Sequence, residues 1–215
     1  MIDKKVVVVD YGLGNLYSVQ RALEHCGVEK VRVSSSVDDI SSADSLILPG
    51  VGAFEDGILG LKELGLIEPI IQHALKNKPL LGICLGMQLL ATASEEFGYH
   101  SGLDLIKGSV VPIPINNENG TQRKVPFIGW SVLKKTEKAR EKDCILSAID
   151  TEMAVYLVHS YCFMPDQADN ILATYNFQGA QITAAIKSNN TYGFQFHPEK
   201  SGEVGLSLLK AFLYL

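Results

Sequence analysis

The sequence predicts a single α/β domain with a mainly parallel central sheet flanked by helices and an additional antiparallel strand section in its second half. Three observations favour this fold class. Lys5 to Asp10 contains four consecutive valines, a pattern typical of a strand buried on both faces of a parallel sheet. Strand-like and helix-like segments alternate through the first half, as in βα units. The second half carries short apolar segments separated by turn residues, which indicates antiparallel pairing.

The first half of the chain is expected to form a succession of strands, most of them followed by a helix. The predicted strands are Lys5 to Asp10, Val31 to Ser35, Ser45 to Pro49 and a strand opened by Pro79; the predicted helices are Ser18 to Cys26, Phe54 to Leu64 and Leu66 to Lys76. Ligands of such sheets bind at the carboxyl ends of the strands. Residues that follow these strands are therefore the first candidates for a functional site.

The second half is expected to consist mostly of strands and to end in a helix. The predicted strands are Leu105 to Pro112, Val125 to Lys134, Met153 to Tyr161, Ile171 to Phe177, Ile182 to Lys187 and Tyr192 to Phe196, with turns at Asn116 to Thr121 and Ser188 to Asn190 and a helix from Gly202 to Leu215. The charged run Lys134 to Lys142 indicates a solvated hairpin or loop. No repeat or linker divides the chain, so we expect residues 1–215 to form one domain.

Composition excludes several classes of function. The 215 residues carry a net charge of −5 and no large basic cluster, so we expect no nucleic-acid partner. No apolar run approaches the length of a membrane span and the N-terminus lacks signal-peptide features, so we expect a cytoplasmic protein without membrane contact. The cysteines at positions 26, 84, 144 and 162 lack metal-ligand spacing, so we expect neither a metal nor disulfides.

A dinucleotide cofactor is also not expected. Gly12-Leu13-Gly14 follows the first strand, but Tyr17 stands where the third glycine of a dinucleotide fingerprint would be. We therefore expect no cofactor.

Cys84 is the strongest candidate for a catalytic residue. An apolar strand ends in Gly82-Ile83-Cys84-Leu85-Gly86, and the following residues read as a helix. This G-x-C-x-G frame is typical of a nucleophile elbow, where glycines avoid clashes around a strained nucleophile. A helix beginning just after the sulfur favours the thiolate and an oxyanion. A lone buried cysteine is most often a small core residue, so the frame carries the interpretation.

His197 and Glu199 are the candidate partners of this thiol. An apolar strand ends on His197-Pro198-Glu199, so that His197 can take the thiol proton while Glu199 binds the other ring nitrogen. A lone histidine at a strand end is most often structural. Together, the three residues predict a Cys84–His197–Glu199 triad.

Two backbone donors and one side chain complete the predicted site. By elbow geometry the N–H of Leu85 is one oxyanion donor, and the glycine-rich segment Gly50-Val51-Gly52 is the candidate for the second. These glycines also allow the backbone to approach a substrate closely or to flip. Gln88 lies one helical turn beyond Cys84, which places its side chain in the same pocket.

These motifs closely resemble those of the class I, triad-type glutamine amidotransferases. The segments GICLGMQLL, GFQFHPEKS, PGVGAF and VHSY carry the resemblance, which spans nearly the whole chain. Within that class, PGVGAF, the Gly129-Trp130 pair and the segment DYGLGN are similar to those of the glutaminase subunit of imidazole glycerol phosphate synthase. The resemblance implies the flavodoxin-like sheet of the class.

The resemblance also implies a reaction and roles for several residues. The reaction is hydrolysis of L-glutamine to glutamate and ammonia, with glutamine held by Gly52, Gln88 and backbone groups of Ser160 and Tyr161. The ammonia is expected to pass to a synthase, the cyclase barrel of histidine biosynthesis, which would form a heterodimer with this chain.

The expected interface consists of Asn15, Trp130, Tyr161 and Lys200. Asn15 is placed there by the resemblance, because it matches a synthase-facing loop of the family. Tyr161 and Lys200 are placed there because they follow strand ends around Cys84. Trp130 is an interface anchor by residue type, although a core position remains open for it.

The chain departs from the family pattern at two places. Ser131 stands where the family usually has Asn, and the segment Pro112 to Lys124 is longer and more polar than expected. These departures keep open a paralogue that supplies ammonia to a surface-sugar amidotransferase. A non-catalytic regulatory protein and a cysteine peptidase on the same fold are further alternatives, and the complete triad and Gln88 argue against them.

Overall fold

The structure is a computed structural model that describes residues 2, 4–116, 120–141, 144–149 and 154–215. Its first half contains β1 Val6–Val9, α1 Leu16–His25, β2 Val31–Ser34, α2 Val37–Ser42, β3 Ser45–Gly50, α3 Phe54–Glu63, α4 Ile67–Leu75, β4 Leu80–Cys84, α5 Leu85–Leu89, β5 Ala93–Ser94 and β6 His100–Ser101. Its second half contains β7 Gly108–Pro112, β8 Phe127–Lys135, the 3₁₀ turns η1 Lys138–Arg140 and η2 Ile145–Ala148, β9 Ala154–His159, β10 Tyr161–Pro165, η3 Ala168–Asn170, β11 Ile171–Phe177, β12 Ala180–Ser188, β13 Thr191–Phe194, η4 Pro198–Lys200 and α6 Gly202–Leu213.

The central sheet joins a parallel half to an antiparallel half. Within the described residues its strand order is β2-β1-β3-β4-β13-β12-β11-β8-β9. The strands from β2 to β13 pair in parallel, and those from β13 onward pair antiparallel. This arrangement confirms the predicted fold class. It brings β4, which ends at Cys84, directly beside β13, which leads to His197.

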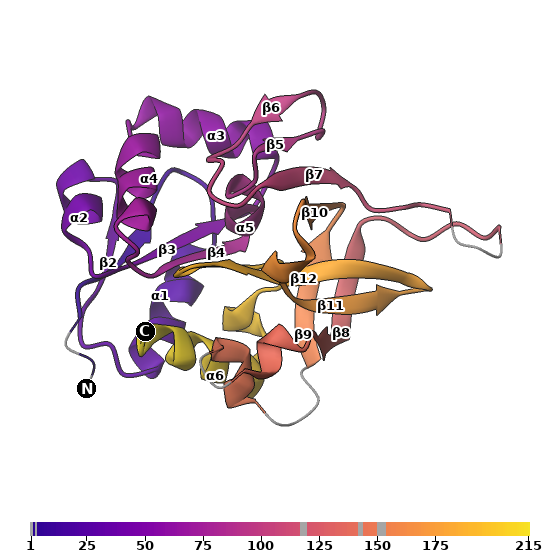
Figure 1. The fold of residues 1–215 in the computed structure, drawn as a ribbon. Helices are drawn as coiled ribbons and strands as arrows, with labels where there is room; N and C mark the ends of the chain where they lie inside the picture. Colours follow the sequence, from indigo (N-terminus) through magenta and orange to yellow (C-terminus); the bar gives the residue numbers. More distant parts are fainter. Residues whose placement is uncertain (1, 3, 117–119, 142–143, 150–153) are drawn as a thin grey trace.

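Each face of the sheet packs against its own set of helices (Figure 1). Val6 and Val8 of β1 face the core formed with α1 and α6, whereas Val7 and Val9 face the core formed with α2, α3, α4 and α5. Successive side chains of a strand point to opposite faces, so a run of four valines supplies both cores. Helices on both faces leave the strand ends as the place for a site.

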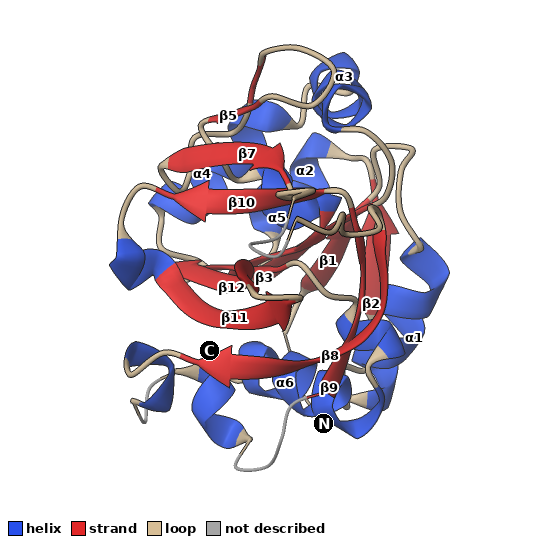
Figure 2. Cartoon of the chain, turned by 90° about the vertical axis from the view of Figure 1, so that its right-hand side faces the viewer, coloured by secondary structure: helices blue, strands red, loops and turns tan. Residues whose placement is uncertain are grey.

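A second, smaller sheet lies against the first and has the order β10-β7-β5-β6 (Figure 2). The chain passes from β9 in the central sheet to β10 in the small sheet through the single residue Ser160. Ile113 N–H donates to the Ser160 carbonyl at 2.9 Å and fixes this crossing. The predicted site residues Ser160 and Tyr161 therefore lie where the two sheets meet.

The segment between β7 and β8 projects as an arm from this junction (Figure 1). The buried Arg123 side chain anchors the arm, because its guanidinium donates to four backbone carbonyls. Two belong to the arm and two to the end of β11 and the turn after it: Pro114 (3.0 Å), Asn116 (2.6 Å), Phe177 (2.9 Å) and Gln178 (2.9 Å). The turn predicted at Asn116 to Thr121 is only partly described, because residues 117–119 lie outside the described residues.

Most predicted elements are confirmed within one to three residues, but several predictions were wrong or incomplete. Leu105 to Lys107 is not strand, because the ladder with β10 begins only at Gly108. The elements α2, β5, β6 and β10 were not predicted. The Lys134 to Lys142 run is not simply a solvated loop: β8 continues to Lys135, and Ala139 in η1 is fully buried.

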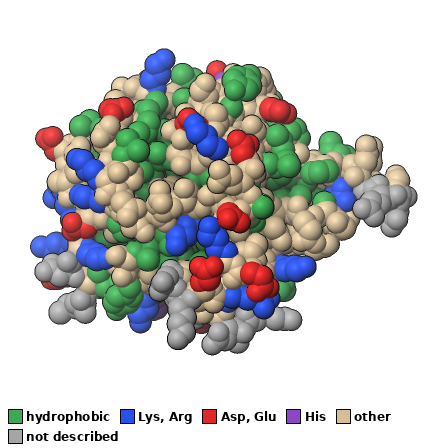
Figure 3. Space-filling model, viewed as in Figure 1, with side chains coloured by type: hydrophobic (Ala, Val, Ile, Leu, Met, Phe, Trp, Pro, Cys, Tyr) green, Lys and Arg blue, Asp and Glu red, His purple; other side chains and the backbone are tan. Residues whose placement is uncertain are grey.

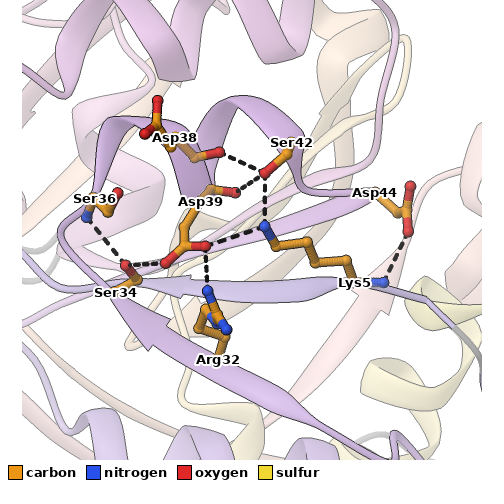
Figure 4. A network of polar contacts seen from close by, with 8 residues as sticks. All are labelled: Lys5, Arg32, Ser34, Ser36, Asp38, Asp39, Ser42 and Asp44. Atoms are coloured by element: carbon orange, nitrogen blue, oxygen red, sulfur yellow. Dashed lines mark hydrogen bonds and ion pairs between the residues drawn. The ribbon is translucent and has the colours of Figure 1, made fainter.

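The helix α2 is tied to the sheet by a network of polar contacts around Asp39 (Figure 4). Its carboxylate accepts hydrogen bonds from Ser34 Oγ at 2.8 Å, Lys5 Nζ at 3.1 Å and Arg32 Nη1 at 2.5 Å. These bonds lower the pKa of Asp39 to about 2. The network joins β1, β2 and α2 at the edge of the sheet.

Charged side chains of both signs are interspersed on the face in Figure 3 and form no large patch of one sign. No helix among the described residues is long and apolar enough to cross a membrane. Over the same part of the chain, no three His, Cys, Asp or Glu side chains gather as metal ligands would. All four cysteines are buried free thiols.

Candidate active site

Cys84 lies on a sharp turn between β4 and α5. Its backbone has φ +54° and ψ −112°, a conformation that non-glycine residues rarely adopt. The flanking glycines are required by close packing: a Cβ at Gly82 would lie 2.5 Å from the Gly86 carbonyl oxygen, and one at Gly86 would lie 1.7 Å from that of Leu48. The turn has the form of the predicted elbow, and Cys84 lines a cavity there.

His197 and Glu199 lie together behind the sulfur. The distance from His197 Nδ1 to Glu199 Oε1 is 2.9 Å, and both side chains are almost completely buried. His197 N–H also donates to the Tyr156 carbonyl on β9 at 2.9 Å. The second Glu199 oxygen, Oε2, has no hydrogen-bond partner among the described residues. Glu199 therefore orients the ring through one oxygen.

The charge of His197 is set by competing effects. Burial alone lowers its pKa. The hydrogen bonds to Cys84 and Glu199 and the charges of these two residues raise the pKa by more than burial lowers it, and the result is a pKa of about 9. A protonated imidazole can stabilise negative charge on a neighbouring sulfur. This arrangement can supply a nucleophile and then a proton for a leaving group.

Cys84 lines a cavity of about 230 Å³. The cavity is lined by Val51, Gly52, Cys84, Leu85, Gln88, Glu96, Pro126, Val158, His159, Ser160, Tyr161 and His197. The sequence prediction named seven of these residues, and Glu199 lies behind His197. A wider hollow of about 820 Å³ lies around Lys4, Lys30 and Arg32, but no Cys, Ser, Thr or His side chain among the described residues lines it.

Comparison with known proteins agrees with this geometry. Residues 7–214 match the family "Glutamine amidotransferase class-I". The chain belongs to this family. A protein of Legionella pneumophila (strain Paris) named imidazole glycerol phosphate synthase subunit HisH 1 is 50% identical over 211 residues, which cover 98% of this chain and 99% of that protein. The HisH subunits of Geobacter sulfurreducens and Aquifex aeolicus are each 43% identical, and the matches cover 97% of this chain.

Solved structures show the same fold at low sequence identity. The structure of PurLQS from Thermotoga maritima superposes with a TM-score of 0.68 at 21% identity and covers 97% of each chain. A crystal structure described as a glutamine amidotransferase gives a TM-score of 0.69 at 16% identity, covering 95% of this chain and 98% of that one.

The amidotransferase site contains three polar residues that the sequence prediction did not name as site residues: His159, which lines the cavity, Gln195 and Glu96. Gln195 is fully buried, and its Nε2 lies 3.8 Å from Cys84 Sγ. It stands two positions before His197, and the alternation of side chains along a strand could have placed both on one side. Glu96 lines the cavity and accepts a hydrogen bond from Phe54 N–H at 2.7 Å. It lies in a loop, where no periodicity identifies it.

Burial also perturbs Glu96. Desolvation raises its pKa, and the hydrogen bond from Phe54 N–H opposes this shift. A carboxylate held in the cavity of the amidotransferase is suited to a positively charged group of a ligand.

The side-chain nitrogen of Gln88 points toward protein groups and not into the cavity. Its Nε2 donates to the Tyr161 carbonyl at 3.1 Å and to Gln195 Oε1 at 3.0 Å. Both N–H bonds are then used, so Oε1 is the part of the Gln88 amide left for a ligand. The Ser160 and Tyr161 carbonyls are likewise engaged, which leaves N–H groups of these residues as candidates for a ligand carboxylate.

The four predicted interface residues have different environments. Trp130 is 57% exposed, which excludes the core position. It lies on the outer face of β8 between the exposed Ile128 and Val132, does not line the cavity, and contacts Tyr156 with ring centroids 6.0 Å apart. Lys200 is exposed after Glu199.

Asn15 and Tyr161 also have contacts within the amidotransferase. Asn15 caps α1 by accepting from Ser18 N–H at 3.4 Å. Tyr161 lines the cavity beside the exposed Phe97, with ring centroids 6.4 Å apart.

Proposed function

We propose that this amidotransferase hydrolyses the side-chain amide of L-glutamine to glutamate and ammonia at Cys84. The observation that carries the proposal is the convergence of a strained Cys84 and a buried His197–Glu199 pair on one cavity. The same cavity contains Gly52, Leu85 and Gln88, the groups needed to bind an amide and its oxyanion.

The proposed reaction uses side chains, backbone N–H groups and water. His197 takes the proton of Cys84, and the thiolate attacks the amide carbon of glutamine. The N–H groups of Leu85 and Gly52 stabilise the tetrahedral oxyanion, and His197 protonates the departing ammonia. A water molecule activated by His197 then hydrolyses the γ-glutamyl thioester and releases glutamate. Gly52 has φ +106°, so this donor depends on a conformation that favours glycine.

The amino-acid end of glutamine is proposed to lie near the junction of the two sheets. The Glu96 carboxylate suits the ammonium group of glutamine, and N–H groups of Ser160 and Tyr161 suit its carboxylate. Gln88 Oε1 can accept an N–H of the substrate. A charge at each end would select a free amino acid over a residue inside a peptide.

The ammonia is proposed to pass to a cyclase subunit that forms a heterodimer with this chain in the cytoplasm. Three relatives at 43–50% identity are named as HisH subunits of imidazole glycerol phosphate synthase. We propose that the outer face of β8 contributes to the contact, because Ile128, Trp130 and Val132 form an exposed apolar row there. Tyr161, Lys200 and the loop at Asn15 are proposed to lie at the same interface.

Ser131 gives little support to a different synthase partner. It is half-buried and alternates along β8 with the exposed Trp130 and Val132, so the change from Asn leaves the outer face of the strand unaltered. The histidine-pathway cyclase is therefore the partner that we propose.

The variant Cys84→Ser tests the proposed reaction. Its complex with the cyclase should lose glutamine-dependent synthesis and keep ammonium-dependent synthesis, because the synthase site lies on the other chain. Glutamate release by the variant at the wild-type rate would show that Cys84 is not the nucleophile. Loss of both activities would instead indicate a damaged complex, which gel filtration of the two chains would reveal.

A further inference from the structure

The Tyr161 carbonyl oxygen fixes the direction of a buried chain of hydrogen bonds. This oxygen can only accept, and two side chains lie on it: Gln88 Nε2 at 3.1 Å and His159 Nδ1 at 2.8 Å. The Gln88 amide must therefore present its nitrogen to this oxygen, and His159 must carry its proton on Nδ1. A single backbone group thus determines the orientation of two side chains.

The orientation of Gln88 determines which atoms donate and which accept in the next hydrogen bonds, toward Gln195 and Cys84. Its Nε2 also lies 3.0 Å from the Gln195 side chain, and only an oxygen can accept from it there. Gln195 Oε1 therefore faces Gln88, and Gln195 Nε2 faces Cys84 Sγ at 3.8 Å, within reach of a hydrogen bond to sulfur. Gln195 is fully buried, so water does not compete for its amide.

The donors and acceptors at the other end of this series of hydrogen bonds, at His159 and Tyr175, are also determined. Burial lowers the pKa of His159 to about 4, against the opposing effect of its bond to the Tyr161 carbonyl, so the ring is neutral at neutral pH. With the proton on Nδ1, Nε2 accepts, and the Tyr175 hydroxyl donates to it at 2.8 Å. His159 and Tyr175 therefore hold the carbonyl on which the orientation of Gln88 and Gln195 depends.

We propose that Gln195 is a further catalytic residue, whose side-chain N–H donates to the Cys84 sulfur and favours the thiolate over the thiol. The Val158 carbonyl oxygen also lies 3.8 Å from this sulfur, and a carbonyl can accept only from the thiol form. Gln195 offsets this preference and leaves His197 free to exchange its proton with the substrate. His159 and Tyr175 are positioning residues. The inference rests on the proposed role of Cys84 as nucleophile.

The inference is tested by the pH profile of Cys84 alkylation with iodoacetamide, which needs no glutaminase activity. The rate is measured by mass spectrometry on the peptide that contains Cys84, because Cys26, Cys144 and Cys162 are also free thiols. Gln195→Met removes the donor and keeps the volume of the side chain. The midpoint of its profile should move up by about one pH unit, which corresponds to about tenfold less thiolate below the midpoint.

Two further variants make the test specific. Gln195→Glu keeps the shape and an oxygen facing Gln88, but replaces the donor at the sulfur by an oxygen, so its midpoint should rise at least as far. Gln72→Met is the matched control, because Gln72 is exposed on α4, and its profile should equal that of the wild type. Each variant is first shown to fold by circular dichroism.

Unchanged midpoints in folded Gln195→Met and Gln195→Glu would overturn the inference and leave Gln195 as a packing residue. If either variant fails to fold, the other one and Tyr175→Phe, which should raise the midpoint by a smaller amount, carry the same test. Failure of the proposed function is distinguishable: Cys84→Ser would then keep glutaminase activity whatever the midpoints show.

Discussion

The sulfur of Cys84 is controlled by three neighbours with different chemical preferences. His197 and Gln195 can donate to it, whereas the Val158 carbonyl can only accept. The strained backbone of Cys84 keeps the sulfur among them. Buried side chains hold two of these neighbours in turn: Gln88 on α5 binds Gln195, and Glu199 binds His197. Reactivity at this residue therefore depends on buried groups that do not line the cavity, Gln195 and Glu199, as well as on groups that do.

The buried His159 makes stability depend on pH. Its pKa is about 4 in the folded chain because burial disfavours the imidazolium, and a histidine in the unfolded chain has a pKa near 6.5. Between these values the unfolded chain binds the additional proton. The stabilising contribution is therefore complete above about pH 6.5 and is lost as the pH falls toward 4, by on the order of 2–3 kcal/mol.

The measurement is urea unfolding at pH 7 and pH 4.5. His159→Asn retains a donor for the Tyr161 carbonyl but does not titrate, so its free energy of unfolding should fall less on acidification than that of the wild type. His25→Asn, in the exposed last turn of α1, is the control. The buried His73 contributes in the same direction, so the decisive quantity is the difference between slopes. Equal slopes for His159→Asn and wild type would contradict this account.

The elbow depends on how closely β3, β4 and α5 pack. Gly82 and Gly86 allow α5 to begin directly at the end of β4 with its backbone against Leu48. The same packing places Leu85 beside Cys84 in the lining of the cavity. A short helix of five residues has little intrinsic stability, so these contacts rather than helix propensity maintain it.

Gly86→Ala should destabilise the fold by at least about 3 kcal/mol, because its Cβ would lie 1.7 Å from a backbone oxygen. Gly57→Ala in α3 is the matched control. Its Cβ would meet side-chain carbons of Leu89 at 3.1 and 3.2 Å and of Leu85 at 3.3 Å. The gain in helix propensity offsets these contacts, so a change within about 1 kcal/mol is expected. Denaturant midpoints measure both variants. Similar losses for the two would show that the elbow is not tightly packed.

The contacts of Asp39 in α2 make the stability of the fold depend on pH in a second, more acidic range. Asp39 has a folded pKa of about 2, below the ordinary value of 3.8, so its stabilising effect is present above about pH 4 and is lost as the pH falls toward 2. The thermal midpoint of the wild type should drop more between pH 5 and pH 2.5 than that of Asp39→Asn. Asp38→Asn, which changes an exposed neighbouring carboxylate, should behave as the wild type does. A wild-type drop no larger than that of Asp39→Asn would refute this role.

Local sequence patterns predicted the elements that carry Cys84, the proposed nucleophile. They missed residues whose place in the site depends on contacts with distant parts of the chain. The four valines of β1 indicate a strand buried on both faces, and the glycines around Cys84 indicate a tightly packed turn. Both features can be recognised from neighbouring residues in the sequence. Gln195 and Glu96 acquire their roles from Gln88 and from the N-terminus of α3, which lie far away in sequence. The strand β10 was missed because its pairing with β7 depends on the crossing at Ser160.

The whole molecule places its site at the junction of two sheets, with an apolar row on one side and the arm on another. Ile128, Trp130 and Val132 alternate along β8, and β9 connects this row to His197 through the Tyr156 carbonyl. A partner that binds the row would thus contact the strand pair that supports His197, the proposed catalytic histidine.

Trp130→Ala should weaken association with the histidine-pathway cyclase about thirtyfold or more, because truncating a buried aromatic anchor costs at least about 2 kcal/mol. The matched control is Leu75→Ala, which removes a side chain 70% exposed on α4 and should leave the Kd unchanged. Titration calorimetry gives both values. An unchanged Kd for Trp130→Ala would exclude the β8 row from the interface. Failure of the wild type to bind this cyclase would favour the sugar-pathway synthase.

Covalent trapping of the nucleophile tests the central claim most directly. A glutamine analogue with an electrophilic carbon in place of the side-chain amide should attach to one residue, and peptide mapping identifies it. The account predicts a single label on Cys84, prevented by excess L-glutamine and absent from Cys26, Cys144 and Cys162. A label on another residue, or a Cys84 label that glutamine does not prevent, would contradict a glutamine-binding site at this elbow.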